Sequence, residues 1–148
     1  MLDKRLIGKE YPPFSFEVEK GKIRDFARAI GDMNPVYHDE EAAKREGFES
    51  LVSPPTFGTV CYAASGLMYT ILEDLKVNLI KLLQGGQEYE YFSPIQAGTI
   101  LTSTTKIADI FEKSGKAGTM HFFVIGTSYV DQNNRKLLTE RLTFIVRD

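Results

Sequence analysis

The sequence predicts an α+β domain in which a curved antiparallel sheet wraps around a long, buried central helix. Residues 15–75 have mainly helical patterns, whereas residues 83–147 have mainly strand patterns. From residue 57 to residue 72, small and apolar residues dominate on all sides of the expected helix, which is typical of a buried one. The chain of 148 residues suits one domain, residues 1–148, whose core needs no disulfide.

The helical elements follow from the spacing of apolar residues. In residues 20–31 these recur at helical spacing, and the last residue, a glycine, is a plausible helix end. Residues 33–37 contain Asn-Pro, which predicts a turn. Residues 39–46 form a short polar helix that Asp39 caps and Gly47 closes.

The second part of the chain changes to strand periodicity. Before it, two prolines in residues 51–60 predict an extended segment and a helix start near Thr56. Residues 86–93 alternate roughly by two, as strands do. Further strands are predicted where β-branched and aromatic residues are frequent, in residues 99–112, 119–131 and 136–147. Residues 113–118 and 132–135 contain Gly, Ser or Asn and predict hairpin connections. The far face of such a sheet needs cover, so burial alone predicts a dimer.

Composition excludes several classes of function. The net charge is −2, and no lysine or arginine cluster is long enough to bind nucleic acid. No apolar stretch reaches the length of a membrane span, and the N-terminus lacks a signal sequence, so we expect a cytoplasmic protein. Cys61 stands in an apolar run, which favours a buried structural thiol. His121 has no second ligand at metal spacing, so no metal site is expected.

Three segments carry a resemblance to a known family. Residues 32–43, DMNPVYHDEEAA, resemble the D-x-N-P-x-H segment of MaoC-like hydratases and dehydratases. Residues 51–59, LVSPPTFGT, look like the segment leading to the family's central helix, and residues 82–101, LLQGGQEYEYFSPIQAGTIL, like its first long strand and turn. The combination of Asn-Pro-x-Tyr with Pro-Pro-Thr-Phe is most similar to the N-terminal or accessory type, known from the first subunit of heterodimeric dehydratases.

The resemblance implies a hot-dog fold and a hydro-lyase activity in fatty-acid-type metabolism. The implied substrate is a 3-hydroxyacyl thioester of coenzyme A or acyl carrier protein, with no cofactor. The implied partner is a second copy in a homodimer, or a second MaoC-like chain in a heterodimer.

The reaction removes an α-proton and protonates the leaving hydroxyl, which an acid/base pair can do. In the family's active branch this pair is the aspartate that Asp32 matches and a histidine five residues later, where Tyr37 stands here. His38 follows, but an offset of one residue on an extended segment turns a side chain to the opposite side. Asp32, His38 and Tyr37 are therefore the catalytic candidates. The alternatives are that Asp32 only forms a turn and that His38 is a loop or helix-capping residue.

The substrate-binding candidates lie in three places. Gly58 and Thr59, just inside the buried helix, are expected to have main-chain amides free to bind a thioester carbonyl, with ordinary helix initiation as the alternative. Gln84 and Gly86 precede the long strand, where glycine lets a ligand approach closely, and in many relatives a histidine stands in the place of Gln84. Asn34 completes the set, although its amide also suits the turn.

Three functions remain open. The chain could hydrate or dehydrate thioesters itself, with His38 or Tyr37 in the usual histidine's part. It could instead be a catalytically deficient subunit that binds the acyl chain for an active partner, which the missing histidine favours. A hot-dog thioesterase is the third class, and the lack of Asp and Glu in residues 56–72 counts against it.

Overall fold

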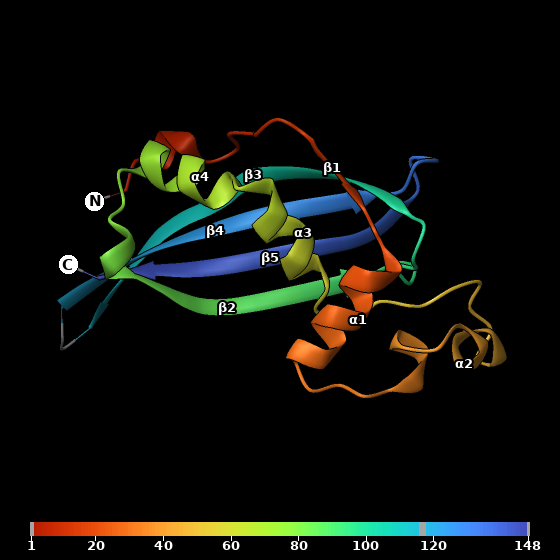
Figure 1. Cartoon of the computed structure of the whole chain (residues 1–148). Coiled ribbons are helices and arrows are strands. Elements are labelled where there is room, and N and C mark those ends of the chain that lie inside the picture. Colours follow the sequence, from red (N-terminus) through yellow and green to blue (C-terminus); the bar gives the residue numbers. More distant parts are fainter. Residues whose placement is uncertain (1, 116–117, 148) are drawn as a thin grey trace.

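The computed structural model describes residues 2–115 and 118–147 and confirms the predicted α+β architecture. One sheet has the strand order β1-β3-β4-β5-β2, and every neighbouring pair is antiparallel. Its strands are β1 (Phe14–Glu17), β2 (Leu82–Tyr91), β3 (Ile100–Gly115), β4 (Gly118–Val130) and β5 (Lys136–Val146). The sheet curves along helices α3 (Gly58–Ser65) and α4 (Leu67–Leu75), which cross one of its faces (Figure 1).

The remaining helical elements lie in the first part of the chain, apart from one short turn before β2. They are η1 (Lys4–Leu6), α1 (Lys20–Ala29), η2 (Pro35–Tyr37), α2 (Glu40–Arg45) and η3 (Leu79–Lys81). The Asp39 carboxylate accepts a hydrogen bond of 2.9 Å from the Glu41 amide, so the predicted cap of α2 is confirmed. Helix α2 lies beyond the end of the sheet at which β2 finishes (Figure 1).

Two expectations about the fold need correction. The strand β1 was not predicted, because its four residues are too few to show a clear alternation. The predicted connection over residues 113–118 is shorter than expected, since β3 continues to Gly115 and β4 begins at Gly118. Residues 116–117, at the tip of this connection, lie outside the described residues. The other predicted hairpin, over residues 132–135, is confirmed.

The buried helix is also interrupted, which the sequence reasoning did not anticipate. Gly66 has a φ of +68°, in the left-handed region that favours glycine, and it separates α3 from α4. The second helix ends at Leu75 rather than at Leu72, so it includes Glu73 and Asp74. The central helix is therefore two shorter helices joined at one glycine.

The core has two parts, and the division between them falls within α3, between Cys61 and Tyr62. Phe57 and Cys61 at the start of α3 pack in one cluster with Tyr37, Tyr129 and other buried residues. The second cluster contains Tyr62 of α3 together with Ile71, Leu72 and Leu75 of α4. The first cluster lies at the end of the sheet near α1, and the second supports the opposite end.

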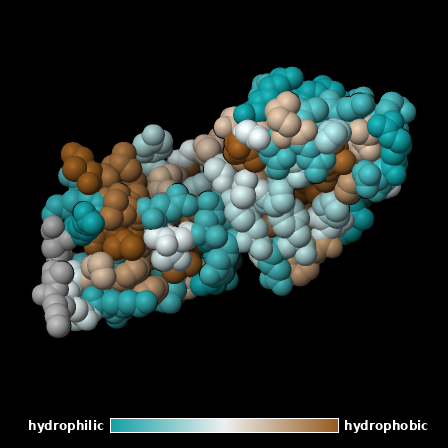
Figure 2. All heavy atoms as spheres, turned by 90° about the horizontal axis from the view of Figure 1, so that it is seen from below, coloured by the Kyte–Doolittle hydropathy of each residue, from teal (hydrophilic) through white to brown (hydrophobic). Residues whose placement is uncertain are grey.

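Strand β2 is an edge strand with an irregularity near its start. Its register against β5 shifts between Gln84 and Gly86, and its other edge pairs with no strand among the described residues. Leu79, Ile80 and Leu83 are exposed apolar residues just before and within the start of β2. Figure 2, seen from below, shows hydrophobic surface gathered at this end of the molecule. No helix in the described part of the chain is both long and apolar enough to cross a membrane.

Candidate functional site

The segment after α1 folds into a turn held by its own side chains. The Asp32 amide donates to the Ala27 carbonyl at 2.9 Å, which continues the end of α1. The Asp32 carboxylate accepts from the Asn34 amide at 3.0 Å, and the Asn34 side chain accepts from the Val36 amide at 3.3 Å. Both side chains thus form turn-stabilising hydrogen bonds, the alternative considered for each. Neither contact excludes a further role for the second carboxylate oxygen of Asp32.

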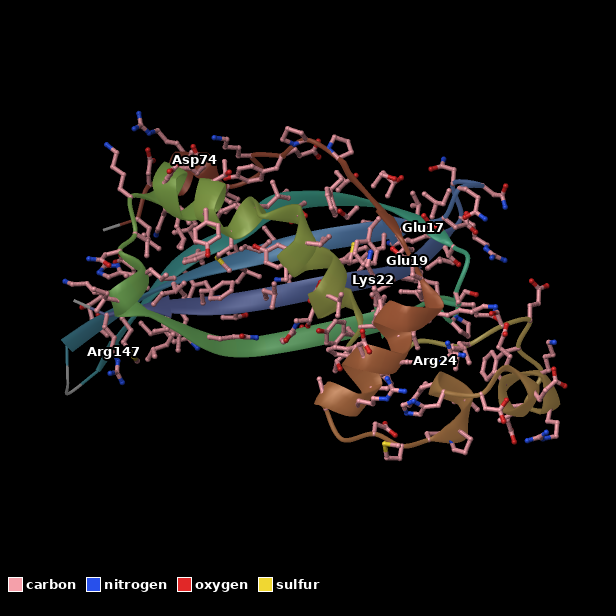
Figure 3. The ribbon with its side chains drawn as sticks, in the orientation of Figure 1. Glu17, Glu19, Lys22, Arg24, Asp74 and Arg147 are labelled. Carbon is pink, nitrogen blue, oxygen red and sulfur yellow. The ribbon has the colours of Figure 1, made fainter. Side chains whose placement is uncertain are left out.

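His38 lies beside Asp32 but contacts its main chain. The His38 ring nitrogen Nε2 is 3.0 Å from the Asp32 carbonyl, and the ring is half-buried. The Arg24 side chain, from α1, donates to the His38 carbonyl at 3.0 Å. Figure 3 shows Arg24 between α1 and the segment that carries η2 and α2. His38 therefore reaches the neighbourhood of Asp32, while the cap of α2 is formed by Asp39.

Tyr37, the third catalytic candidate, is buried. It belongs to the 3-10 helix η2 and to the first core cluster. Burial raises the pKa of its hydroxyl above the usual value, and the negative charge of Asp32 raises it further. The hydroxyl is therefore protonated at neutral pH, and Tyr37 can donate a hydrogen bond but cannot act as a base there.

A cleft of about 890 Å³ opens beside Tyr37, between the η2–α2 segment and the end of β2. Its walls are largely apolar and aromatic, with contributions from Val36, Tyr37, Phe48, Tyr91, Phe92 and Ile95. Asn34 and Arg45 also line it. Ser53 also lines the cleft, and its hydroxyl oxygen is buried without a hydrogen-bond partner in the described part of the chain. The cleft thus offers an apolar volume with a few polar groups, as ligand sites commonly do.

The start of α3 packs tightly against the sheet. A Cβ added to Gly58 would lie 3.1 Å from Tyr89 Cε1 and 3.1 Å from Leu138 Cδ2, closer than side chains normally approach. The Thr59 amide donates to the Thr56 carbonyl at 3.1 Å, so the expectation that this amide is free was wrong. The reason is that residues 55–57, directly before α3, already form a turn, which places the Thr56 carbonyl where it accepts from the Thr59 amide. The Thr59 side chain, in contrast, is exposed.

Gln84, Gly85 and Gly86 were expected to precede the long strand, but they lie within β2, which begins at Leu82. The two glycines also differ from each other. A Cβ on Gly85 would lie 2.9 Å from side-chain carbons of Ile145, so the close approach that requires glycine is to Ile145, within the sheet. Gly86 is exposed, and a Cβ there would meet only Thr143 Cβ at 3.9 Å, an ordinary contact. Gln84 is exposed, and its amide donates to the side-chain carbonyl of Gln87 at 3.1 Å.

A buried carboxylate, which the sequence reasoning missed, lies between the sheet and the start of α3. Glu140 on β5 is 1% exposed. Its carboxylate accepts from the Tyr129 hydroxyl at 2.7 Å and from the Gln87 side chain at 2.6 Å. The Thr59 and Tyr89 hydroxyls lie 2.6 Å apart and both contact the same Gln87 nitrogen. We call these five side chains (Thr59, Gln87, Tyr89, Tyr129 and Glu140) the Glu140 cluster.

The sequence did contain a signal for this cluster. Glu140 alternates with Leu138 and Leu142 along β5, so period two places it on the buried face. The cluster also changes the argument against a thioesterase, which rested on the lack of a carboxylate near the central helix. Glu140 and Asp74 both lie at that helix, but Glu140 is bound through both oxygens and Asp74 is paired with Lys9 at 2.6 Å.

Two further expectations concern Cys61 and His121. Cys61 is buried as predicted, and burial raises the pKa of its thiol to about 12. His121 lies on β4, and its Nδ1 is 3.0 Å from a carboxylate oxygen of Glu112 on β3. No group of His, Cys, Asp and Glu side chains within residues 2–115 and 118–147 is arranged to hold a metal ion.

Comparisons with known proteins place the chain in a family. The family described as "FAS1-like, dehydratase domain region" matches residues 5–140. A UPF0336 protein of Streptomyces coelicolor is 40% identical over 118 residues, which cover 77% of each chain. The HadBC (3R-hydroxyacyl-ACP dehydratase) complex from Mycobacterium tuberculosis has a chain with a TM-score of 0.77 and 25% identity, matched over 92% of both chains.

A second solved structure extends the similarity of fold. A chain titled MaoC-like dehydratase has a TM-score of 0.84 and 24% identity, covering 95% of this chain and 42% of that one. This chain thus corresponds to less than half of that longer protein. The agreement of sequence family and fold leads to one conclusion: the chain belongs to the FAS1-like dehydratase-region family and has the hot-dog fold of the MaoC-like dehydratases and hydratases.

Proposed function

We propose that this chain is a subunit of a hydro-lyase that interconverts 3-hydroxyacyl and enoyl thioesters of coenzyme A or acyl carrier protein. In this proposal it shapes the acyl-thioester site, and a second MaoC-like chain supplies the histidine of the acid/base pair. The family and the fold support the reaction class. The HadBC structure, which is titled a 3R-hydroxyacyl-ACP dehydratase complex, supports an assembly of two hot-dog chains.

The state of Tyr37 is the observation that carries the proposal. It occupies the position of the family's histidine, and burial and the charge of Asp32 together keep its hydroxyl protonated. A protonated phenol can hydrogen-bond to a ligand oxygen but cannot abstract an α-proton at neutral pH. With Tyr37 in this state, the chain holds the carboxylate of the pair and lacks its histidine.

The cleft beside Tyr37 is the proposed place for the acyl group. Its aromatic and aliphatic walls favour an apolar chain, because burial of apolar surface drives binding there. Asn34, at its wall, is the proposed polar contact from the turn. Gln84 and Gly86 lie further along β2, where the bulge exposes the main chain for the carrier arm of the thioester.

The edge of β2 is the proposed contact with the second chain. Its free hydrogen-bonding edge adjoins the exposed Leu79, Ile80 and Leu83. Exposed apolar residues beside an unpaired strand favour pairing with another chain. The partner in this proposal is either a second copy or a second MaoC-like chain.

One observation favours a second candidate, an enzyme that is active without a partner histidine. The His38 ring lies 3.0 Å from the Asp32 carbonyl, so the imidazole is in the immediate neighbourhood of the Asp32 residue. In that case Asp32 and His38 would act as the pair, and Tyr37 would only donate a hydrogen bond.

Hydration of crotonyl-CoA tests both candidates. The chain is assayed alone and after co-expression with a MaoC-like chain that carries an intact D-x-N-P-x-H segment, and the loss of enoyl absorbance is followed. Activity only in the mixture, lowered by Asp32→Asn, supports the subunit. Activity of the chain alone that His38→Ala abolishes supports the second candidate. Asp25→Asn, at an exposed carboxylate on α1, is the matched control. Failure of the chain, alone and mixed, to hydrate or bind a thioester would exclude both candidates.

A further inference from the structure

We infer that the Thr59 hydroxyl donates a hydrogen bond to the carbonyl oxygen of the bound thioester, and that Glu140 is the positioning residue that fixes the direction of this hydroxyl. The inference rests on the proposed function for the identity of the ligand. Its structural basis is the Glu140 cluster, whose hydrogen bonds connect the buried Glu140 carboxyl group through Gln87 to the Thr59 hydroxyl.

Glu140 determines the orientation of two side-chain amides. The NH2 group of Gln87 donates to the Glu140 carboxyl group at 2.6 Å. The Gln87 carbonyl then points away from Glu140 and accepts from the Gln84 NH2 group at 3.1 Å. The carbonyl of Gln84 is left facing outward. The buried Glu140 side chain thus orients the amide of Gln87, which in turn orients the amide of the exposed Gln84.

The same network reaches the Thr59 hydroxyl. The second N–H of Gln87 faces both the Thr59 and the Tyr89 hydroxyls, and its nitrogen lies 2.9 Å from Thr59 Oγ1. The Thr59 and Tyr89 hydroxyls are 2.6 Å apart, and either can donate to the other. When Tyr89 donates to Thr59, the proton of Thr59 is left for a ligand, and Thr59 is exposed.

The position of this outward donor suits a ligand that enters from the cleft. Tyr89 and Tyr91 lie on the same face of β2, and Tyr91 lines the cleft while its hydroxyl donates to the Pro55 carbonyl at 2.7 Å. Thr59 itself does not line the cleft, but Tyr89, which it contacts, is two residues from the cleft-lining Tyr91 on the same strand. Burial, together with the charge of Glu140, raises the pKa of Tyr89 to about 12, which keeps its proton in place at neutral pH.

The chemistry of the site selects a neutral acceptor. A hydroxyl that can donate towards the ligand favours a carbonyl oxygen as its acceptor. During removal of an α-proton this oxygen gains negative charge, and a preorganised donor stabilises it without reorganisation. Thr59 is thus assigned to the carbonyl itself, through its side chain rather than through its amide.

Two ligands that differ only at the carbonyl test the assignment. Hexanoyl-CoA is an unreactive thioester, and S-hexyl-CoA is the thioether that has a methylene in place of the carbonyl. Binding to the full chain, in its complex where one forms, is measured by calorimetry. We expect Thr59→Val to weaken hexanoyl-CoA binding about 5- to 10-fold, as the loss of one hydrogen bond does, and to leave S-hexyl-CoA unchanged. Thr59→Ser keeps the hydroxyl and should restore the preference for the thioester.

The outcomes separate this inference from the proposed function. If the wild type binds the thioester and Thr59→Val weakens both ligands equally or neither, the role of Thr59 is wrong while the proposed function stands. If the wild type binds neither ligand, the proposed function fails and the inference fails with it.

The positioning role of Glu140 has its own readout. In 15N-labelled protein without ligand, Glu140→Gln should shift the side-chain NH2 resonances of both Gln87 and Gln84, and it should reduce the preference for hexanoyl-CoA. Gln87→Leu, which cuts the link between Glu140 and Thr59, should reduce the same preference and serves as the test if Glu140→Gln does not fold. Unchanged Gln87 and Gln84 resonances in a folded Glu140→Gln protein would overturn the positioning role.

Discussion

The Tyr129 hydroxyl lies 2.7 Å from the Glu140 carboxylate, and both side chains are buried between the sheet and α3. Tyr129→Phe removes this donor and leaves a buried carboxylate with one partner fewer. We expect the free energy of unfolding to fall by about 1–3 kcal/mol, the cost of an under-satisfied buried group. Urea denaturation measures the change, and Tyr69→Phe at an exposed tyrosine of α4 is the control. Equal midpoints for the two variants would show that the contact contributes nothing to stability.

The left-handed conformation of the glycine between α3 and α4 leads to a second prediction. Gly66 has a φ of +68° and open space around its Cα, so alanine there meets no neighbour but must adopt a left-handed conformation. We expect Gly66→Ala to cost about 1 kcal/mol. Gly21, within α1, has the same open space without the positive φ, so Gly21→Ala should be neutral or stabilise by up to about 0.5–1 kcal/mol. Thermal melts of both variants give the comparison, and a loss of stability in both would contradict the conformational explanation.

The contacts of Asp74 make the free energy of unfolding depend on pH. The Lys9 ammonium at 2.6 Å and the Tyr11 hydroxyl at 2.8 Å lower the pKa of this carboxyl below its usual value (Figure 3 labels Asp74 on α4). A lowered folded-state pKa contributes stability above the unfolded-state pKa of about 4, and that contribution is lost as the pH falls through the folded-state value.

The corresponding variant is Asp74→Asn. At pH 7 we expect it to be less stable than the wild type by about 1 kcal/mol, since the pair is only partly buried. The difference should shrink below about pH 4, where the wild-type carboxyl also becomes neutral. Urea midpoints at several pH values measure this, and a constant difference down to pH 2 would contradict the assignment.

Cys61 should be unreactive while the protein is folded. Its side chain is fully buried, and burial raises the pKa of the thiol to about 12, so the thiolate required for reaction is scarce at pH 8. A chromogenic disulfide reagent should label the thiol only as fast as the protein unfolds, and labelling in guanidinium should be complete within the mixing time. Rapid labelling of the native protein would show that α3 leaves the sheet readily.

Much of the fold could be predicted because hydrophobic periodicity is a local property. The alternation in residues 136–147 and the helical spacing in residues 20–31 each specify an element without reference to the rest of the chain. The break at Gly66 was harder to foresee, because glycine also occurs inside buried helices where it packs closely. Its left-handed conformation is decided by how α3 and α4 pack against the sheet.

The site was less predictable than the fold, because it depends on contacts between distant segments. The turn of Asp32 and Asn34 is local, and its side-chain hydrogen bonds were among the alternatives considered. The Glu140 cluster joins β2, β4, β5 and α3, and no spacing along the chain reveals that Gln87 meets Glu140. Strand parity places Glu140 inside, but it does not identify the partners that satisfy the carboxylate.

The kink at Gly66 has a consequence for how this protein can change over time. Gly58 and Thr59 before it contact members of the Glu140 cluster, whereas Ile71, Leu72 and Leu75 after it pack in the second core cluster. Substitutions in Leu67–Leu75 can therefore accumulate over evolution while the start of α3 keeps its geometry. A single left-handed residue allows ligand recognition and core packing to diverge separately within one small domain.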